Sequence, residues 1–109
     1  MKWSIKYLPE AVKDLKDLAG NQRILVAKAL EKVSSNPLPM SEGGFGKPLG
    51  NHNGTKLSGL LKIKLKDAGI RIVYSLIRTE TEMIIIVIGA RADDEVYDAA
   101  QHRVAKHDL

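Results

Sequence analysis

The sequence predicts a single small α+β domain over residues 1–109, with the element order β-α-α-β-β-β-α and an antiparallel sheet packed against an N-terminal helical hairpin. Two patterns lead to this prediction. Apolar residues in the first third recur at steps of three and four, as on helices, whereas residues in the second half alternate between polar and apolar, as on strands. A chain of 109 residues that is 44% hydrophobic can form one core without metal or disulfide support.

One strand and two helices are expected in the first third of the chain. The strand covers about residues 2–7, where the alternating apolar positions are Trp3, Ile5 and Tyr7. The first helix should begin near Pro9, and its apolar positions are Leu8, Ala11, Val12, Leu15, Leu18 and Ala19. Asn21 is expected to cap the second helix, whose apolar positions are Ile24, Ala27, Leu30 and Val33. Only a short break at Gly20 separates the helices, which predicts an antiparallel hairpin.

The second half of the chain is expected to begin with a loop and to continue with strands. Residues 36–55 contain three prolines and five glycines without periodicity, which predicts a long loop. Such a loop is often functional, and an ordered wrap around an edge of the sheet fits equally well. Three strands follow, over about 59–66, 71–78 and 83–90. The last is apolar on both faces and is expected at the centre of the sheet. A closing helix should begin at Asp93 or Asp94 and include Val104.

Positive charge is concentrated on the strands that follow the loop. Residues 56–78 include six lysines and arginines and one acidic residue, although the net charge of the chain is only +4. From residue 79 onward, three basic residues stand against seven acidic ones. A basic segment in an otherwise balanced chain indicates an anionic partner, of which the phosphate backbone of a nucleic acid is the commonest.

The basic residues of this segment are expected to share one face of the sheet. Side chains alternate along a strand, so one face carries Lys62, Lys64 and Lys66. A turn over residues 67–70 would set Lys66 opposite Arg71 and Lys64 opposite Val73, and Arg71 would join that face. Four cations on one face favour nucleic-acid binding over a role in the core.

The composition also excludes several classes of protein and site. The chain has no cysteine, so disulfides, thiolate chemistry and cysteine-ligated zinc are excluded. Its three histidines lack the spacing of metal ligands, and neither a metal nor another cofactor is expected. The longest apolar run, from Met83 to Ile88, is too short to cross a bilayer, and the N-terminus lacks the apolar region of a signal peptide. A cytoplasmic protein with no membrane partner is expected.

Two segments taken together resemble a known family. LSGLLKIKLKDAGIRIVY, at residues 57–74, and GARADDEVY, at residues 89–97, are similar to the RelE/ParE superfamily of bacterial toxins from toxin–antitoxin pairs. The resemblance is closest to the RelE branch of ribosome-dependent ribonucleases. It extends over nearly the whole chain, because the expected N-terminal helices and the KPLGN segment also fit.

The resemblance implies an active site and a reaction. In the RelE branch the site consists of strand lysines, the arginine that opens the next strand, the arginine after the apolar strand and the tyrosine of the last helix. The matching residues here are Lys62, Lys64, Arg71, Arg91 and Tyr97. The implied reaction is metal-independent cleavage of messenger RNA in the ribosomal A site, by attack of the ribose 2′-oxygen on the adjacent phosphate. Further RNA contacts are expected from Lys56 and Lys66.

The chemistry of that reaction suggests a role for each residue. Tyr97 or a lysine is expected to accept the proton of the 2′-hydroxyl, with Lys62 supporting the ionised form. Lys64 and Arg71 are expected to hold the phosphate oxygens, and Arg91 to stabilise the leaving group.

Partners and alternative functions also follow from the resemblance. It implies a cognate antitoxin, the ribosome with its messenger RNA, and operator DNA only through the antitoxin complex. Two alternatives remain open at the level of sequence. One is a ParE-like toxin that inhibits DNA gyrase by binding and has no nuclease activity; the other is an inactive relative that acts as a DNA-binding corepressor with its antitoxin.

Overall fold

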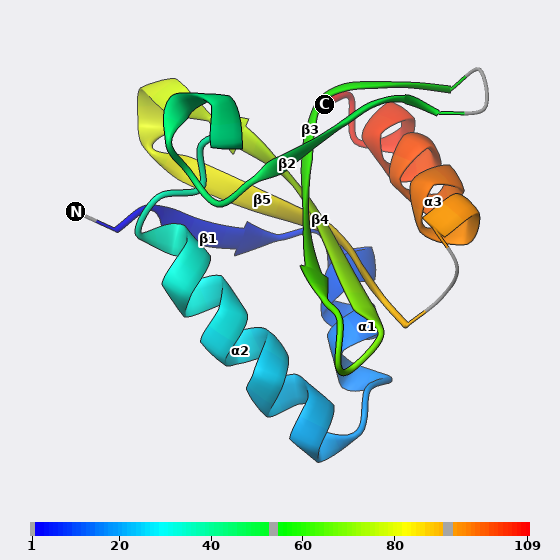
Figure 1. The fold of residues 1–109 in the computed structure, drawn as a ribbon. Coiled ribbons are helices and arrows are strands. Elements are labelled where there is room, and N and C mark those ends of the chain that lie inside the picture. The colour runs from blue at the N-terminus through cyan, green and yellow to red at the C-terminus, as the bar shows by residue number, and fades with distance from the viewer. Residues whose placement is uncertain (1, 53–54, 91–92) are drawn as a thin grey trace.

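The computed structural model describes residues 2–52, 55–90 and 93–109, with backbone alone at 50–52, 55–58 and 93–94. In chain order, the elements are β1 (Ser4–Tyr7), α1 (Pro9–Lys16), α2 (Gly20–Ser34), β2 (Lys47–His52), β3 (Thr55–Leu65), β4 (Ile70–Ile77), β5 (Glu82–Gly89) and α3 (Asp93–Lys106). Short 3-10 turns occur at Met40–Glu42 and Arg78–Glu80. The predicted α+β class is confirmed (Figure 1).

The strands form one mixed sheet in the order β1-β5-β4-β3-β2. β1 runs parallel to β5, whereas the other neighbours are antiparallel. The prediction of a wholly antiparallel sheet is therefore wrong at β1, because alternation of apolar residues identifies a strand but not the direction of its partner. The apolar strand β5 is also one place from the centre, which β4 occupies.

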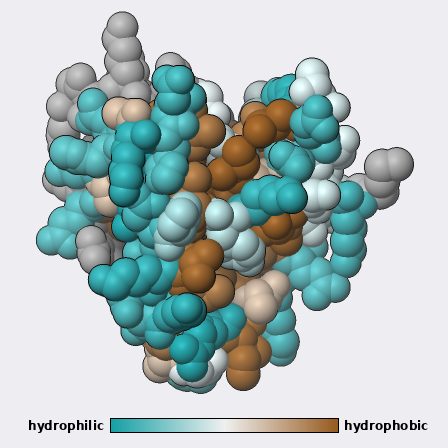
Figure 2. All heavy atoms as spheres, turned by 180° about the vertical axis from the view of Figure 1, so that it is seen from behind, coloured by the Kyte–Doolittle hydropathy of each residue, from teal (hydrophilic) through white to brown (hydrophobic). Residues whose placement is uncertain are grey.

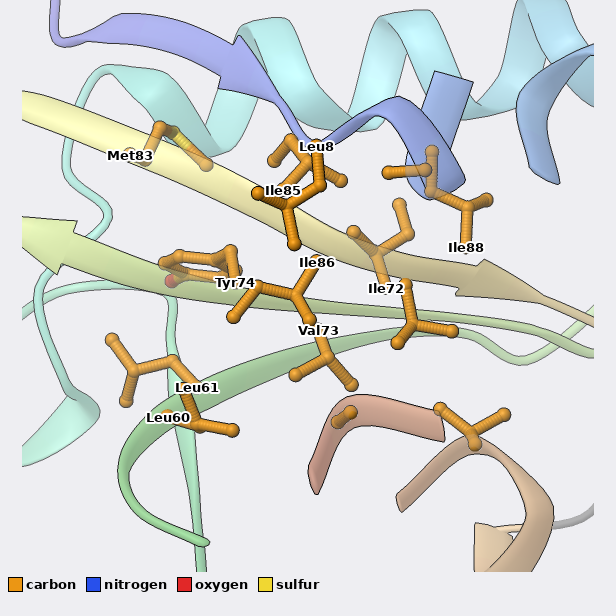
Figure 3. Packing of buried hydrophobic residues seen from close by; sticks show 14 of the residues in the cluster. Leu8, Leu60, Leu61, Ile72, Val73, Tyr74, Met83, Ile85, Ile86 and Ile88 are labelled. Carbon is orange, nitrogen blue, oxygen red and sulfur yellow. The ribbon is translucent and has the colours of Figure 1, made fainter. Parts of the chain in front are cut away.

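Helices cover both faces of this sheet. α1 and α2 lie on one side and α3 on the other (Figure 1), and in the close-up β4 and β5 run between them (Figure 3). This arrangement explains why β5 is apolar on both faces: Met83, Ile85 and Ile86 are each 0% exposed. The residues buried with them include Leu8, Ala11, Val26, Leu30, Val33, Ile70, Ile72, Val73, Tyr74, Val96 and Ala100.

The N-terminal helices differ from the prediction in detail. α1 ends at Lys16, and α2 is capped at Ala19, whose backbone N–H donates to Gln22 Oε1 at 3.1 Å, so the predicted cap at Asn21 is wrong. The predicted apolar stripe is wrong in the first half of α2, because Ile24 is 58% exposed and Val26 is buried instead. In Figure 1 the first turns of α2 lie beyond the ends of the strands.

In the described part of the glycine- and proline-rich segment, residues 36–52, only the first half is a loop. Backbone hydrogen bonds from Phe45 to Asn36 and from Gly46 to Leu38, each 3.0 Å long, close residues 36–46. Residues 47–52 form the edge strand β2, which pairs with β3. The prediction of a loop over 36–55 is therefore wrong for β2, whereas the alternative of an ordered segment at the sheet edge is confirmed. Prolines and glycines in a sequence normally indicate a loop, but a strand at the edge of a sheet tolerates both, so such a strand is easily missed.

A single tyrosine joins this loop to the core. Tyr74 is fully buried and its hydroxyl donates to the Pro37 carbonyl at 2.7 Å. Burial raises the pKa of Tyr74 well above its usual range, so the hydroxyl keeps the proton that it donates. Gly46 crosses directly over this hydroxyl, and a Cβ at that position would lie 2.4 Å from it. Only glycine therefore fits there.

None of the helices within the described ranges is both long enough and apolar enough to traverse a bilayer.

Candidate active site

The β3–β4 turn sets the positions of the basic side chains. Lys64 pairs with Arg71 and Lys62 with Val73, two residues away from the predicted register. The difference arises because β3 ends at Leu65, which leaves Lys66 in the turn. Directly opposed residues point to the same face of a sheet, so Lys62, Lys64 and Arg71 still share one face, as predicted.

The same face receives the tyrosine of the last helix. Lys62 Nζ donates a hydrogen bond of 2.5 Å to the Tyr97 hydroxyl oxygen. Nζ lies 5.2 Å from the centroid of the Tyr97 ring, and the two distances together place it beyond the oxygen, near the ring plane. The contact is therefore a charge-assisted hydrogen bond and not a cation–π contact, which requires the cation above the ring.

Apolar packing holds Tyr97 at this position. Val96 and Ala100 on α3 are fully buried, and Tyr97 is 4% exposed. α3 packs against β3, β4 and β5, so that Tyr97 faces the strand that carries Lys62. Lys62 is half-buried and Lys64 is exposed. The exposure of the side chains therefore increases from the buried Tyr97 through Lys62 to Lys64.

A hollow of about 240 Å³ lies at that open end and is lined by Lys64, Leu65, Lys66, Gly69, Ile70 and Arg71. Gly69 has a φ of 67°, which favours glycine and allows the tight turn that brings both strands to the hollow. Three of the lining residues, Lys64, Lys66 and Arg71, are cationic, and Leu65 and Ile70 are apolar. Such a site suits an anion the size of a phosphate group, with room for the attached ribose.

The remaining predicted residues contribute no side-chain geometry. Arg91 lies outside the described residues, and the side chain of Lys56 is outside the described part of β3. Their expected roles stay predictions. Within the described ranges, no group of three or more histidine, aspartate or glutamate side chains is placed to hold a metal ion.

Sequence reasoning missed a pair of charged residues that join two helices, Asp14 on α1 and Arg103 on α3. Arg103 Nη1 lies 2.6 Å from Asp14 Oδ2, and Arg103 Nη2 lies 3.2 Å from Asp14 Oδ1. Their side chains are only 13% and 16% exposed. No motif indicates this pair, because the two residues are 89 positions apart and each has the spacing of an ordinary surface charge.

Two further contacts join the end of α3 to α1. Lys106 Nζ lies 2.9 Å from Glu10 Oε2, and His107 Nε2 lies 2.9 Å from Glu10 Oε1. The hydrogen bond from Lys106, with smaller contributions from the Glu10 backbone N–H and His107, lowers the pKa of Glu10 to about 2. α3 is therefore held at its C-terminal end by charges and at its N-terminal end by apolar contacts.

Comparison with known proteins identifies related chains. Residues 5–95 match the family model described as ParE toxin of type II toxin–antitoxin system, parDE. A RelE-like toxin protein of Escherichia coli is 28% identical over 108 residues, which covers 95% of this chain and 99% of the relative. The mRNA interferase toxin RelE of E. coli K12 is 27% identical over 107 residues, with the same two coverages.

Solved structures have the same fold. The free state of a doubly substituted E. coli RelE toxin superposes with a TM-score of 0.72 at 25% identity, covering 95% of this chain and 99% of that one. The toxin–antitoxin complex RelBE2 of Mycobacterium tuberculosis contains a chain with a TM-score of 0.67 at 23% identity, covering 85% of this chain and 95% of that one. The match to the family model, supported by these likenesses, shows that the chain belongs to the ParE toxin family of type II toxin–antitoxin systems, within the RelE/ParE superfamily, and is a RelE-like toxin.

Proposed function

We propose that this toxin is an endoribonuclease that cleaves messenger RNA in the ribosomal A site without a metal. The observation that carries the proposal is the hydrogen bond between Lys62 and Tyr97, on the face that also bears Lys64 and Arg71. The names of two relatives, both 27% identical over almost their whole length, support it: each is called an mRNA interferase.

The proposed reaction is an in-line transfer at one phosphodiester. The ribose 2′-oxygen loses its proton and bonds to the adjacent phosphorus, while the bond from phosphorus to the 5′-oxygen breaks and that oxygen takes up a proton. The products are a 2′,3′-cyclic phosphate and a 5′-hydroxyl end. The reaction needs a proton acceptor, cations for the phosphorane oxygens and a partner for the leaving oxygen.

The Lys62–Tyr97 pair supplies the proton acceptor in this proposal. An ammonium at hydrogen-bond distance stabilises negative charge on the phenol oxygen and fixes the direction of its lone pairs. Lys62 is the less buried of the two, so RNA on the open end of β3 meets the ammonium first. The two side chains then act as one proton-transfer unit.

The remaining roles concern charge on the phosphate. Lys64 and Arg71, opposite each other on β3 and β4, hold the two non-bridging oxygens at the hollow beside the turn. Arg91 is assigned to the leaving oxygen by its position after β5, and Lys66 and Lys56 to neighbouring RNA. These assignments rest on the resemblance to the RelE branch and on the shared face of β3 and β4.

We also propose a cognate antitoxin, and operator DNA as a partner only through the antitoxin complex. Several structures of similar fold are RelE-type toxins bound to RelB antitoxins. Figure 2, seen from behind Figure 1, shows a strip of apolar surface between hydrophilic areas. A partner segment that combines acidic and apolar residues would complement basic side chains and apolar surface of this kind.

Ribosome-bound message and DNA gyrase are the two targets to compare. The purified toxin should cut message on translating ribosomes and leave gyrase supercoiling unchanged, and Arg71→Ala should abolish cutting while the protein stays folded. Inhibition of gyrase without cutting would support the ParE-like alternative. A toxin that neither cuts message nor inhibits gyrase, and arrests no growth, would support the corepressor alternative.

A further inference from the structure

The edge of β5 is left open where β1 ends. β1 pairs with β5 as far as Tyr7 and Ile85, and the Leu8 backbone N–H donates to the Ile85 carbonyl at 3.0 Å. The chain then turns into α1, so β1 offers no further partner to the last residues of β5. Backbone groups on a strand edge without partners are costly when they are covered by protein.

Asp14 and Arg103 take the place of the missing strand. Arg103 Nη1 donates to the Ile86 carbonyl at 2.8 Å, and the Ile88 backbone N–H donates to Asp14 Oδ2 at 3.0 Å. The same two side chains form the forked ion pair described above. We call Asp14 and Arg103, with the two backbone groups that they bind, the edge clamp.

The edge clamp constrains both the position and the rotation of α3 relative to β5. A forked arginine–carboxylate pair constrains both position and orientation, unlike the apolar contacts of Val96 and Ala100, which permit sliding. Arg103 lies six residues after Tyr97, about 9 Å along the helix axis, so any rotation or shift of α3 at Arg103 moves Tyr97 as well.

We propose that Asp14 and Arg103 are positioning residues, which hold the Tyr97 hydroxyl against Lys62 by locking α3 to the edge of β5. This inference rests on the proposed ribonuclease function where it concerns activity. The geometric part, the dependence of the Lys62–Tyr97 contact on the edge clamp, can be measured without a ribosome.

The experiment compares two arginines that differ in their surroundings. Arg103→Met breaks the edge clamp. Arg78→Met is the matched control, because Arg78 also makes a forked pair, with Glu42 at 2.9 and 2.7 Å, but that pair is exposed and joins no part of α3. Nuclear Overhauser effects between the Tyr97 ring and the Lys62 side chain report the contact, and single-turnover cleavage of ribosome-bound message reports activity.

The inference predicts that Arg103→Met weakens the Tyr97–Lys62 Overhauser effect and slows cleavage by about tenfold to a hundredfold, because small displacements of reacting groups are that costly. The ribosome concentration for half-maximal cleavage should change by less than about twofold, since the clamp is not on the basic face. Arg103→Lys should recover part of the rate, because lysine can reach one of the two partners. Arg78→Met should match the wild type in both measurements.

A folded Arg103→Met variant with an unchanged Overhauser effect and an unchanged rate would overturn the inference. If that variant does not unfold cooperatively, Asp14→Asn replaces it, because asparagine keeps an acceptor for the Ile88 N–H and removes the ion pair. A wild type that cleaves no message would refute the proposed function alone, and the Overhauser effects would still decide whether the edge clamp positions Tyr97.

Discussion

The Lys62 ammonium on β3 donates a 2.5 Å hydrogen bond to the Tyr97 hydroxyl on α3, although the two residues are 35 positions apart. One partner comes from a strand that also carries Lys64, and the other from a helix that is anchored by buried apolar residues and by the Asp14–Arg103 ion pair. The contact unites the charged face of the sheet with a buried phenol, which is the arrangement that the proposed proton transfer requires.

Removal of the phenol oxygen should separate activity from folding. Tyr97→Phe retains the buried ring and loses the acceptor of Lys62, so message cleavage should fall by about a hundredfold or more. Single-turnover assays on ribosome-bound message measure the effect. Tyr7→Phe is the control, because Tyr7 is 38% exposed on the edge strand β1, which two strands separate from β3 and Lys62. Equal rates for Tyr97→Phe and wild type would reject Tyr97 as part of the proton-transfer unit.

The cations on the shared face should be visible in the salt dependence of binding. Lys64→Gln and Arg71→Gln should each lower the slope of log affinity against log salt by about 0.7, the value for one phosphate contact on a single strand. Binding to message-programmed ribosomes is measured over a salt range in which the ribosomes stay intact. Lys2→Gln, which removes an exposed lysine paired with Glu31, should leave the slope unchanged. If Lys64→Gln and Arg71→Gln had the same salt slope as Lys2→Gln and the wild type, phosphate binding by this face would be contradicted.

The close approach of Gly46 to Tyr74 should be sensitive to a single methyl group. Gly46→Ala would place a Cβ 2.4 Å from the Tyr74 hydroxyl and 3.0 Å from Leu61 Cδ1, and should lower the free energy of unfolding by about 1–3 kcal/mol. Urea unfolding measures the change. Gly20→Ala is the control at the start of α2, where the nearest atom to a new Cβ is Arg23 Nη2 at 3.9 Å. Equal losses in both variants would show that the close approach is not the cause.

The contact of Glu10 with the end of α3 should make stability depend on pH in the acid range. Its pKa is lowered to about 2, so its contribution is complete above the ordinary value near 4.5 and is lost as the pH falls toward 2. The difference in unfolding free energy between wild type and Glu10→Gln should therefore shrink across that range.

The cause of this shift can be checked directly by NMR titration of the Glu10 carboxyl group. Lys106→Met removes the largest cause and should raise the pKa of Glu10 toward its ordinary value, whereas Lys2→Met should not. A pKa that is the same in Lys106→Met and wild type would assign the shift to another group.

The sequence predicts those parts of the fold that depend on local pattern. The helices, four of the strands and the shared face of Lys62, Lys64 and Arg71 follow from periodicity alone. The register of β3 and β4 differs by two residues, because the length of a turn is not encoded in alternation. The edge strand β2 is missed because proline and glycine are tolerated at an edge.

Long-range contacts are beyond this kind of reasoning. The proximity of Tyr97 to Lys62 follows from the sequence only if the last helix is taken to turn back over the sheet, or from family resemblance, because the approach of α3 to β3 has no local signature. The edge clamp is not predictable even by resemblance, since Asp14 and Arg103 compensate for the early end of β1. The role of charged side chains that bind the backbone of an edge strand can be recognised only in the three-dimensional structure.

The most direct measurement is primer extension on transcripts that are being translated in the presence of the purified toxin. The proposed ribonuclease should produce discrete breaks inside the reading frame that require ribosomes, persist in the presence of a chelator added after initiation at a level that keeps ribosomes assembled, and disappear in Tyr97→Phe. Intact transcripts with the wild-type toxin, or breaks that are equally strong in Tyr97→Phe, would contradict it.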